Sequence, residues 1–294
     1  MTYTAPPSVR SYAGRKGVDL DHVAASSGRK SLAKEDVDHH LSPATDPVPS
    51  ASYRYWEVDH SAYGPTRPEP TSRIAQTAAA NLSAANTVIP QVTHHDEVDA
   101  RQVEAFRASL KAEAKERGLK LTSLVFHIKA MSQCLKRFPI FNSSLSADGR
   151  TLHFKNYIHI GVAVDTQWGL MVPVIRNADR KGLWALASDL EDLAQRAQAR
   201  KLRTDDMGGA SLSVSNLGAI GGTGFSPIVN PPEVAILGLS RTRTTPVWQD
   251  EKWEPVPMTP LDLSYDHRVI NGAEAARFMR HYCSLIEEPR RMLI

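Results

Sequence analysis

The sequence predicts an α/β protein in which strands and helices alternate from residue 71 to residue 294, after a small domain of two helices. Three observations predict this fold. Apolar residues of the C-terminal part recur at the helical period in some segments and at every second position in others. A stretch rich in Pro, Ser and Ala, residues 43–70, predicts an extended linker between the two parts. With 41% hydrophobic residues among 294, the larger part can bury a substantial core.

The composition argues against several classes of function. A net charge of +3 is too small to indicate binding to nucleic acid. No apolar run is long enough to predict a membrane span, and the N-terminus lacks the apolar segment of a secretory signal. Cys134 and Cys283 lie far apart without a metal-ligand spacing, so two buried thiols in a reducing compartment are expected. We therefore expect a cytoplasmic protein that binds neither nucleic acid nor membranes.

The N-terminal domain, residues 7–42, is predicted from two short helical segments. The first covers residues 8–15, and the second, LAKEDVDHHL, covers residues 32–41. The sequence between them, GVDLDHVAASSGRK, contains one apolar pair, Leu20 and Val23, and we expect a loop there. A unit of this size buries little surface and is expected to be marginally stable alone.

The helices of the large domain are predicted from apolar residues that share one helical face. The first helix carries four such residues between Val103 and Ala114 and ends at Gly118. Thr122 is expected to cap the second helix, which Pro139 stops. The last two helices are predicted at residues 183–200 and 273–286.

The strands are predicted from alternation and from short apolar runs. Residues 157–165, YIHIGVAVD, carry apolar side chains at every second position, which is the period of a half-buried strand. The pair His94 and His95 is interpreted as part of a strand whose adjacent side chains point to opposite faces, so no metal site is expected there. Further strands are predicted at residues 170–175, 211–216, 233–239 and 259–266.

The segment DLSYDHRVINGAEAARF, residues 262–278, raises the question whether His267 is a reactive base. The histidine follows a predicted strand and precedes a predicted helix, a junction from which side chains can reach a cleft. Imidazole titrates near neutral pH and can accept a proton from a thiol or a hydroxyl nucleophile. A histidine that only bonds a backbone carbonyl is the more common case, so the residues alone leave both interpretations open.

Ser215, at the end of the predicted strand 211–216, is the second candidate. Its hydroxyl could donate a hydrogen bond to a developing oxyanion, although one serine is a weak indication. The glycines that follow in NLGAIGGTGFSPIVNPPE resemble a phosphate-binding loop, but prolines stand where a helix N-terminus would be needed. We therefore interpret this segment as a glycine-rich connection between strands.

Several segments of the large domain resemble one protein family. LSYDHRVINGAEAARF is very similar to a motif of the dihydrolipoamide acyltransferases, the core components of 2-oxo acid dehydrogenase complexes. FPIFNSSL, YIHIGVAVDTQWGLMVPVIRNAD, SLSVSNLGAIGGTGFSPIVNPPEVAILGLS and PVWQDEKWEPVPMTPLDLSYDHR resemble other blocks of that family, in the same order. The resemblance covers residues 71–294 and is greatest to the acetyltransferases of pyruvate dehydrogenase complexes.

The resemblance implies a chloramphenicol-acetyltransferase-like fold, a mixed sheet flanked by helices, assembled as a homotrimer. In this family the active site lies between subunits, where coenzyme A enters from one side and the dihydrolipoyl arm from the other. His267 is then the general base that deprotonates the attacking thiol, and Ser215 stabilises the oxyanion of the tetrahedral intermediate. The implied reaction is acyl transfer between dihydrolipoamide and coenzyme A. Coenzyme A is a substrate of this reaction, and no metal is expected to take part.

The resemblance implies roles for further residues. Asn271 stands where many members carry Asp, and its amide is expected to orient His267 or its neighbours. Asp266 and Arg268 are expected to form ion pairs that shape the turn. Arg73 matches a family arginine, which implies contact with the phosphates of coenzyme A or, as an alternative, an ion pair at a subunit interface. The C-terminal EEPRRMLI resembles tails that pack between trimers, which implies a 24-subunit cage.

Residues 7–42 resemble the peripheral subunit-binding domain, which implies binding to the decarboxylase and dihydrolipoamide dehydrogenase components. The loop departs from that family, because Ser31 stands where an arginine is usual. No lipoyl domain precedes this unit, so the lipoyl group is expected to come from another, lipoylated chain in trans or from a missing segment. Two alternatives stay open: a scaffold that organises partners in a cage with minor catalysis, and acyl transfer to a small hydroxyl acceptor. Retention of both His267 and Ser215 favours catalysis.

Overall fold

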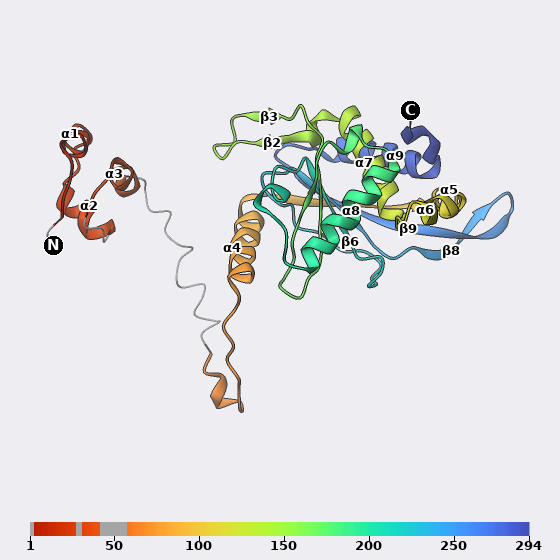
Figure 1. Cartoon of the computed structure of the whole chain (residues 1–294), viewed down its shortest axis with the longest axis horizontal. Coiled ribbons are helices and arrows are strands. Elements are labelled where there is room, and N and C mark those ends of the chain that lie inside the picture. Colours follow the sequence, from red (N-terminus) through yellow and green to blue (C-terminus); the bar gives the residue numbers. More distant parts are fainter. Residues whose placement is uncertain (1–2, 28–30, 42–57, 294) are drawn as a thin grey trace. The chain divides into compact units, whose positions relative to one another are not determined.

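The computed structural model describes residues 3–27, 31–41 and 58–293 and contains two compact units, Met1–Glu69 and Pro70–Ile294 (Figure 1). Most of the predicted linker, residues 43–57, lies outside the described residues. None of the described helices has both the length and the apolar composition needed to cross a bilayer.

The first unit contains three helices where the sequence predicted two. They are α1 Pro7–Lys16, α2 Leu20–Ser27 and α3 Lys34–Leu41. The predicted loop was wrong because its apolar pair, Leu20 and Val23, has the i, i+3 spacing of one short helical face. Asp19 precedes this helix and accepts a hydrogen bond from the backbone N–H of Asp21 (2.9 Å), as N-cap residues do. Val23 is fully buried and packs with apolar residues of the other helices.

The second unit is built on one mixed sheet. Within the described residues, seven strands form this sheet in the order β1-β9-β7-β6-β4-β5, and β8 pairs with β9 outside this path. The inner strands β4, β6 and β7 run parallel, and the other pairs are antiparallel. The strands are β1 Gln91–Asp99, β4 Ile160–Val162, β5 Val174–Ile175, β6 Leu212–Asn216, β7 Ala235–Leu239, β8 Arg243–Gln249 and β9 Lys252–Asp266. The predicted mixed sheet is therefore confirmed.

Helices flank the sheet, as predicted, and a small hairpin stands apart from it. The α-helices are α4 Arg73–Val88, α5 Arg101–Ser109, α6 Lys111–Glu116, α7 Ser123–Arg137, α8 Leu183–Gln198 and α9 Gly272–Glu287. The 3-10 helices of this unit are η3 Pro139–Asn142, η4 Ala178–Arg180, η5 Thr204–Asp206 and η6 Pro289–Leu293, whereas η2 His60–Ala62 belongs to the first unit. The separate hairpin consists of β2 Ser143–Leu145 and β3 Leu152–Phe154.

Two helix predictions need correction. The helix expected up to Gly118 is two helices, which meet at Leu110, where the backbone N–H bonds the carbonyl of Arg107 (3.3 Å), three residues back, in place of the carbonyl of Phe106. Thr122 is the N-cap residue of α7, but its side chain makes no capping hydrogen bond. The backbone carbonyl of Thr122 instead accepts from the Val125 N–H (3.2 Å), and the threonine hydroxyl is buried without a partner among the described residues.

Several strands have other lengths than predicted. The regular part of the strand expected at 157–165 covers Ile160–Val162, and Val164 continues only as a single bridge to Met171. The strand expected at 170–175 is reduced to Val174–Ile175 because Pro173 has no N–H to add to the ladder. The last strand begins earlier, at Lys252, and forms with β8 a ribbon that extends past the rest of the sheet (Figure 1).

The two faces of the sheet differ in chemistry, because its inner strands alternate apolar and polar residues. Strand β6 alternates as Leu-Ser-Val-Ser, and β9 ends as Leu-Asp-Leu-Ser-Tyr-Asp. The apolar members form one buried cluster with side chains of α7, α8 and α9, which cover that face. They are Leu212, Val214, Leu237, Leu239, Leu261, Leu263 and Tyr265. The opposite, polar face presents Ser213, Ser215, Gly238, Asp262 and Ser264.

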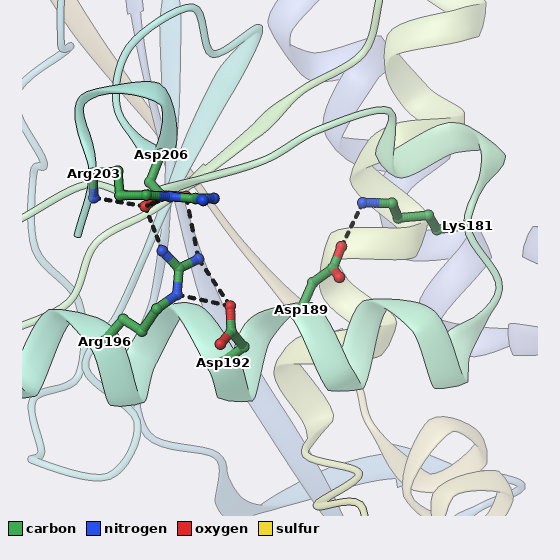
Figure 2. Close-up of polar contacts among 6 residues, drawn as sticks. All are labelled: Lys181, Asp189, Asp192, Arg196, Arg203 and Asp206. Carbon is green, nitrogen blue, oxygen red and sulfur yellow. Dashed lines mark hydrogen bonds and ion pairs between the residues drawn. The ribbon is translucent and has the colours of Figure 1, made fainter. Parts of the chain in front are cut away.

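Ion pairs lie on the outer side of α8 (Figure 2). Arg196 bonds both Asp192, one turn earlier in the helix, and Asp206 in η5. Asp206 also accepts a hydrogen bond from the backbone N–H of Arg203 (2.7 Å). The hydrogen bonds from Arg196 hold the pKa of the Asp206 carboxyl well below its usual range. These contacts attach η5 to the helical layer.

Candidate active site

Ser215 is positioned by the sheet. It lies near the C-terminal end of β6, half-buried, on the polar face. The neighbouring residue on β7 is Gly238, which has no side chain to cover the serine hydroxyl. After Asn216 the chain leaves the sheet, and the Asn216 side-chain oxygen accepts from the Gly218 N–H (2.9 Å) to start the glycine-rich connection. The predicted location at a strand end is therefore confirmed.

His267 lies directly after β9 and is exposed. Its backbone N–H donates to the carbonyl of Pro90 (3.1 Å), which holds the histidine against the residue before β1. Its ring lies 5.8 Å, centroid to centroid, from the ring of Tyr265, whose pKa is raised by burial. Both contacts fix the strand end and leave the imidazole accessible to a substrate.

The turn around His267 is rigid. The Asp266 carboxylate accepts from the Arg268 guanidinium (2.7 Å) and from the Arg268 backbone N–H (3.0 Å). The Asp266 carbonyl accepts from the N–H groups of Val269 and Ile270, both at 3.0 Å. The expected Asp266–Arg268 ion pair is thus present. It determines the direction in which the chain passes from β9 to α9.

Asn271 is the N-cap residue of α9. Its side-chain oxygen accepts from the Glu274 N–H (2.9 Å), and the Glu274 carboxylate accepts from the Asn271 N–H (3.2 Å), which completes a capping box. The oxygen of Asn271 is therefore occupied by the helix. Its amide NH₂ keeps two donors, and no hydrogen bond from that group occurs among the residues described.

Arg73 is the first residue of α4 and is exposed. Ser72 caps this helix by accepting from the Ala75 N–H (3.1 Å). In the described part of the chain no carboxylate pairs with the Arg73 guanidinium.

The structure does not bring Ser215 and His267 together within one chain. Ser215 pairs with Gly238 and Gly238 pairs with Asp262, so the serine is level with a residue five positions before His267 on β9. Five strand residues span about 16 Å, and two strand spacings add about 10 Å sideways. The two side chains therefore lie roughly 20 Å apart, at opposite ends of the sheet.

Sequence reasoning missed Glu233, a buried carboxyl group near the His267 end of the sheet. One of its oxygens accepts from the Ser213 hydroxyl (2.9 Å) and the Asn230 amide (3.0 Å), and the other has no partner among the described residues. Burial raises its pKa to about 7, an effect that these hydrogen bonds and Lys155 only partly oppose. No pattern marked this residue, because it follows the prolines of a segment interpreted as a connection.

A cavity of about 530 Å³ lies beside the His267 turn. It is lined by Asp266 and Arg268 on one side, by Ala85 and Ile89 near the end of α4, and by Glu233. Its walls combine apolar helix residues with polar groups, as ligand cavities commonly do. The cavity adjoins the histidine end of the sheet and is distant from Ser215.

Comparison with known proteins identifies the family. Residues 63–294 match the model of the 2-oxoacid dehydrogenases acyltransferase family (catalytic domain), and the chain belongs to this family. It is 45% identical over 99% of its length to the dihydrolipoyllysine-residue acetyltransferase component of the pyruvate dehydrogenase complex of Pseudomonas aeruginosa. The corresponding component of Azotobacter vinelandii is 43% identical over 99% of the chain. The chain spans 55% and 47% of the lengths of these two relatives.

Solved structures share the fold. Dihydrolipoamide acetyltransferase of Azotobacter vinelandii is 48% identical and superposes with a TM-score of 0.79 over 81% of this chain and 98% of that one. That structure was studied for the roles of a serine, a histidine and an asparagine in the catalytic mechanism; the histidine follows the serine by 52 residues and the asparagine follows the histidine by 4. The cubic core of a pyruvate dehydrogenase multienzyme complex matches with the same identity and TM-score.

Proposed function

We propose that the protein transfers an acetyl group between dihydrolipoamide and coenzyme A, as a catalytic core of a pyruvate dehydrogenase complex. The observation that carries this proposal is the spacing of three residues. Ser215, His267 and Asn271 are separated by 52 and 4 residues, as are the serine, histidine and asparagine studied in the Azotobacter vinelandii acetyltransferase. Family membership over residues 63–294 supports the same reaction class.

The proposed site combines two copies of the chain. His267 and Ser215 lie at opposite ends of one sheet, so neither can complete a site within its own subunit. A cyclic assembly brings one end of each subunit against the other end of its neighbour. A homotrimer with His267 of one subunit facing Ser215 of the next satisfies this geometry. Eight such trimers in a cage would correspond to the cubic core of the related complex.

His267 acts on the thiol. The imidazole of His267 accepts the proton of the thiol as the thiol attacks, which is the role of a general base. The thiol of coenzyme A forms a bond to the carbonyl carbon of acetyl-dihydrolipoamide, and the carbonyl electrons move onto oxygen. Ser215 donates a hydrogen bond to this oxyanion. When the intermediate collapses, the dihydrolipoamide sulfur leaves and takes the proton from the imidazolium.

Asn271 and Arg73 have supporting roles in the proposal. The side-chain oxygen of Asn271 caps α9, and its amide NH₂ remains to orient His267 of the same turn or the substrate. Arg73, exposed at the start of α4, is proposed to contact the phosphates of coenzyme A, because guanidinium groups bind phosphate in a bidentate manner.

We also propose partners for the N-terminal unit and a source for the lipoyl group. The three-helix N-terminal unit is proposed to bind the decarboxylase or dihydrolipoamide dehydrogenase components. The lipoyl group would be delivered by another chain or by a segment outside this sequence. A cytoplasmic location fits the two cysteines, Cys134 and Cys283, which are both free and buried. A pull-down of each component with the chain, with and without residues 1–45, tests the binding.

The activity is tested by supplying acetyl-coenzyme A and free dihydrolipoamide and following thioester formation. His267→Ala is expected to lower kcat about a thousandfold, because a positioned general base contributes 10² to 10⁴. Ser215→Ala is expected to lower it about a hundredfold, the effect of one oxyanion donor. A wild-type protein without activity, or a His267→Ala variant with unchanged activity, would refute the proposal.

The two-copy site is tested by mixing inactive chains. When Ser215→Ala and His267→Ala chains are unfolded together and refolded at equal amounts, one interface in four pairs an intact His267 with an intact Ser215. About a quarter of wild-type activity should then return. Each variant refolded alone is the control. Activity that stays at the average of the two variants would show that each chain holds its own site.

A further inference from the structure

Four residues of the polar face lie in one row across the sheet. Ser215 on β6 pairs with Gly238 on β7, Gly238 pairs with Asp262 on β9, and Asp262 pairs with His95 on β1. Because in-register neighbours point to the same face, the side chains of this row face the same side as the Ser215 hydroxyl. The sequence alone favours a solvated or interface role for His95 over a metal site.

The ring of Phe225 fills the gap in this row at Gly238. A Cβ atom placed on Gly238 would lie 2.9 Å from Cζ of Phe225, which is closer than such atoms approach. The end of the phenyl ring therefore occupies the side-chain position between Ser215 and Asp262. Neighbouring Cβ positions across strands are about 5 Å apart, so the ring end lies within about 8 Å of the Ser215 Cβ.

Asp262 holds Phe225 in this place. Its carboxylate accepts from the backbone N–H of Phe225 (3.1 Å) with one oxygen and bonds Nδ1 of His95 (2.6 Å) with the other. Asp262 is only 2% exposed. The chain passes so closely over this carboxylate that a Cβ on Gly224 would lie 3.4 Å from one oxygen. These contacts hold the backbone of Phe225 beside Asp262, with its ring end against Gly238.

The position of the Phe225 ring affects the space that an acyl group has beside Ser215. If Ser215 bonds the oxyanion, the carbon that carries the acyl chain lies about 4 Å from the serine oxygen. A branched or longer chain that extends toward β7 meets the ring, which is fixed to the sheet through Asp262.

We infer that Phe225 limits the acyl group at Ser215 to acetyl, and that Asp262, held by His95, is the residue that positions it. This inference rests on the proposed acyl transfer and goes beyond it by naming the residues that set the size of the acyl group. Phe225 is the specificity-determining residue, and Asp262 is a positioning residue that acts through it.

The test compares acetyl-coenzyme A with isobutyryl-coenzyme A as donors to free dihydrolipoamide, with the full chain. The readout is the ratio of the two kcat/KM values, which a general loss of folded protein does not change. Phe225→Ala is expected to reduce the preference for acetyl about tenfold by raising kcat/KM for isobutyryl, in the range that one or two methylene groups give in a pocket. Asp262→Ala is expected to reduce it about threefold, because the ring is released and still present.

Phe154→Ala is the matched control, since Phe154 is an exposed phenylalanine on β3, and it should leave the ratio unchanged. Should Phe225→Ala fail to fold, Phe225→Leu replaces it, with an expected reduction of about threefold. Acetyl transfer by wild type with an unchanged ratio in the Phe225 variant overturns this inference alone. The absence of acetyl transfer by wild type overturns the proposed function and this inference with it.

Discussion

The two faces of the central sheet come from the same strands and have different tasks. On the helix-covered face, Leu237, Leu261 and Leu263 are fully buried in one apolar cluster. On the opposite face, the residues between them on the same strands are Gly238, Asp262 and their neighbours, which bond other side chains and backbone groups. Alternation along a strand separates the two sets by a single residue.

The difference between the two faces shows which residues stabilise the fold and which ones are available for chemistry. A leucine in the apolar cluster contributes by removing surface from water and by filling space. A serine or an aspartate on the polar face contributes little in that way, and its neighbours must satisfy it with hydrogen bonds. We therefore expect substitutions on the first face to change the free energy of unfolding, and those on the second to change mainly the reaction.

The largest effect on stability is expected at Leu263, on the helix-covered face of β9. Leu263→Ala removes a fully buried side chain and leaves a cavity, which should cost about 4 kcal/mol. The neighbouring Ser264→Ala removes one hydrogen bond, to Thr93 (2.8 Å), and should cost about 1 kcal/mol. Urea unfolding of both variants measures the contrast. Equal losses at the two positions would contradict the division of tasks between the faces.

Sequence patterns predicted the parts of the molecule that are buried. The helices α7, α8 and α9 and the strands β6 and β7 were found because their apolar residues must face one core. Helix α4 was missed because it is mostly exposed, with Ala85 its one buried residue, and its alanines, serines and asparagines show no apolar face. Strand β8 was missed for the same reason, since its exposed residues include Pro246.

The resemblance supplied the residues of the candidate site and implied a site between subunits, but it supplied no distance within one chain. Ser215, His267 and Asn271 were found through family motifs, which resemblance makes visible without any structure. The distance between Ser215 and His267 depends on how distant strands pair, and no local pattern contains that information. The row from Ser215 to His95 cannot be predicted from local sequence patterns either, because its four members come from four strands.

A smaller effect, dependent on pH, is expected at Glu233, near the other end of the polar face. Its pKa is raised from 4.5 to about 7 in the folded protein, so the folded state retains a proton that the unfolded chain loses. The contribution of Glu233 to the free energy of unfolding is therefore fully present below pH 4.5 and is lost as the pH rises through 7. Glu233→Gln, which still accepts from Ser213 and Asn230, should stabilise the protein by about 3 kcal/mol at pH 8 and leave it unchanged at pH 4.5.

The measurement is urea unfolding of wild type and variant across this pH range. Glu116→Gln is the control for a carboxylate outside the core, since Glu116 is exposed on α6 and its carboxylate has no hydrogen bond or ion pair among the described residues. A gain for Glu233→Gln that is the same at pH 4.5 and pH 8 would show that packing, and not protonation, distinguishes the two side chains.

The smallest effect is expected outside both faces, at Asp206 beside α8 (Figure 2). Asp206→Asn weakens the bonds to Arg196 and to the Arg203 N–H, and should cost about 1 kcal/mol at pH 7, since the amide oxygen of Asn still accepts one of these hydrogen bonds. Because the folded pKa of this carboxyl is lowered, its contribution is present above pH 4 and is lost as the pH falls further. Wild type and variant should therefore converge in stability toward pH 2. A loss at pH 7 as large as that of Leu263→Ala would mean that η5 and its ion pairs belong to the stability core, and the contrast would then lie between the helical layer and the polar face.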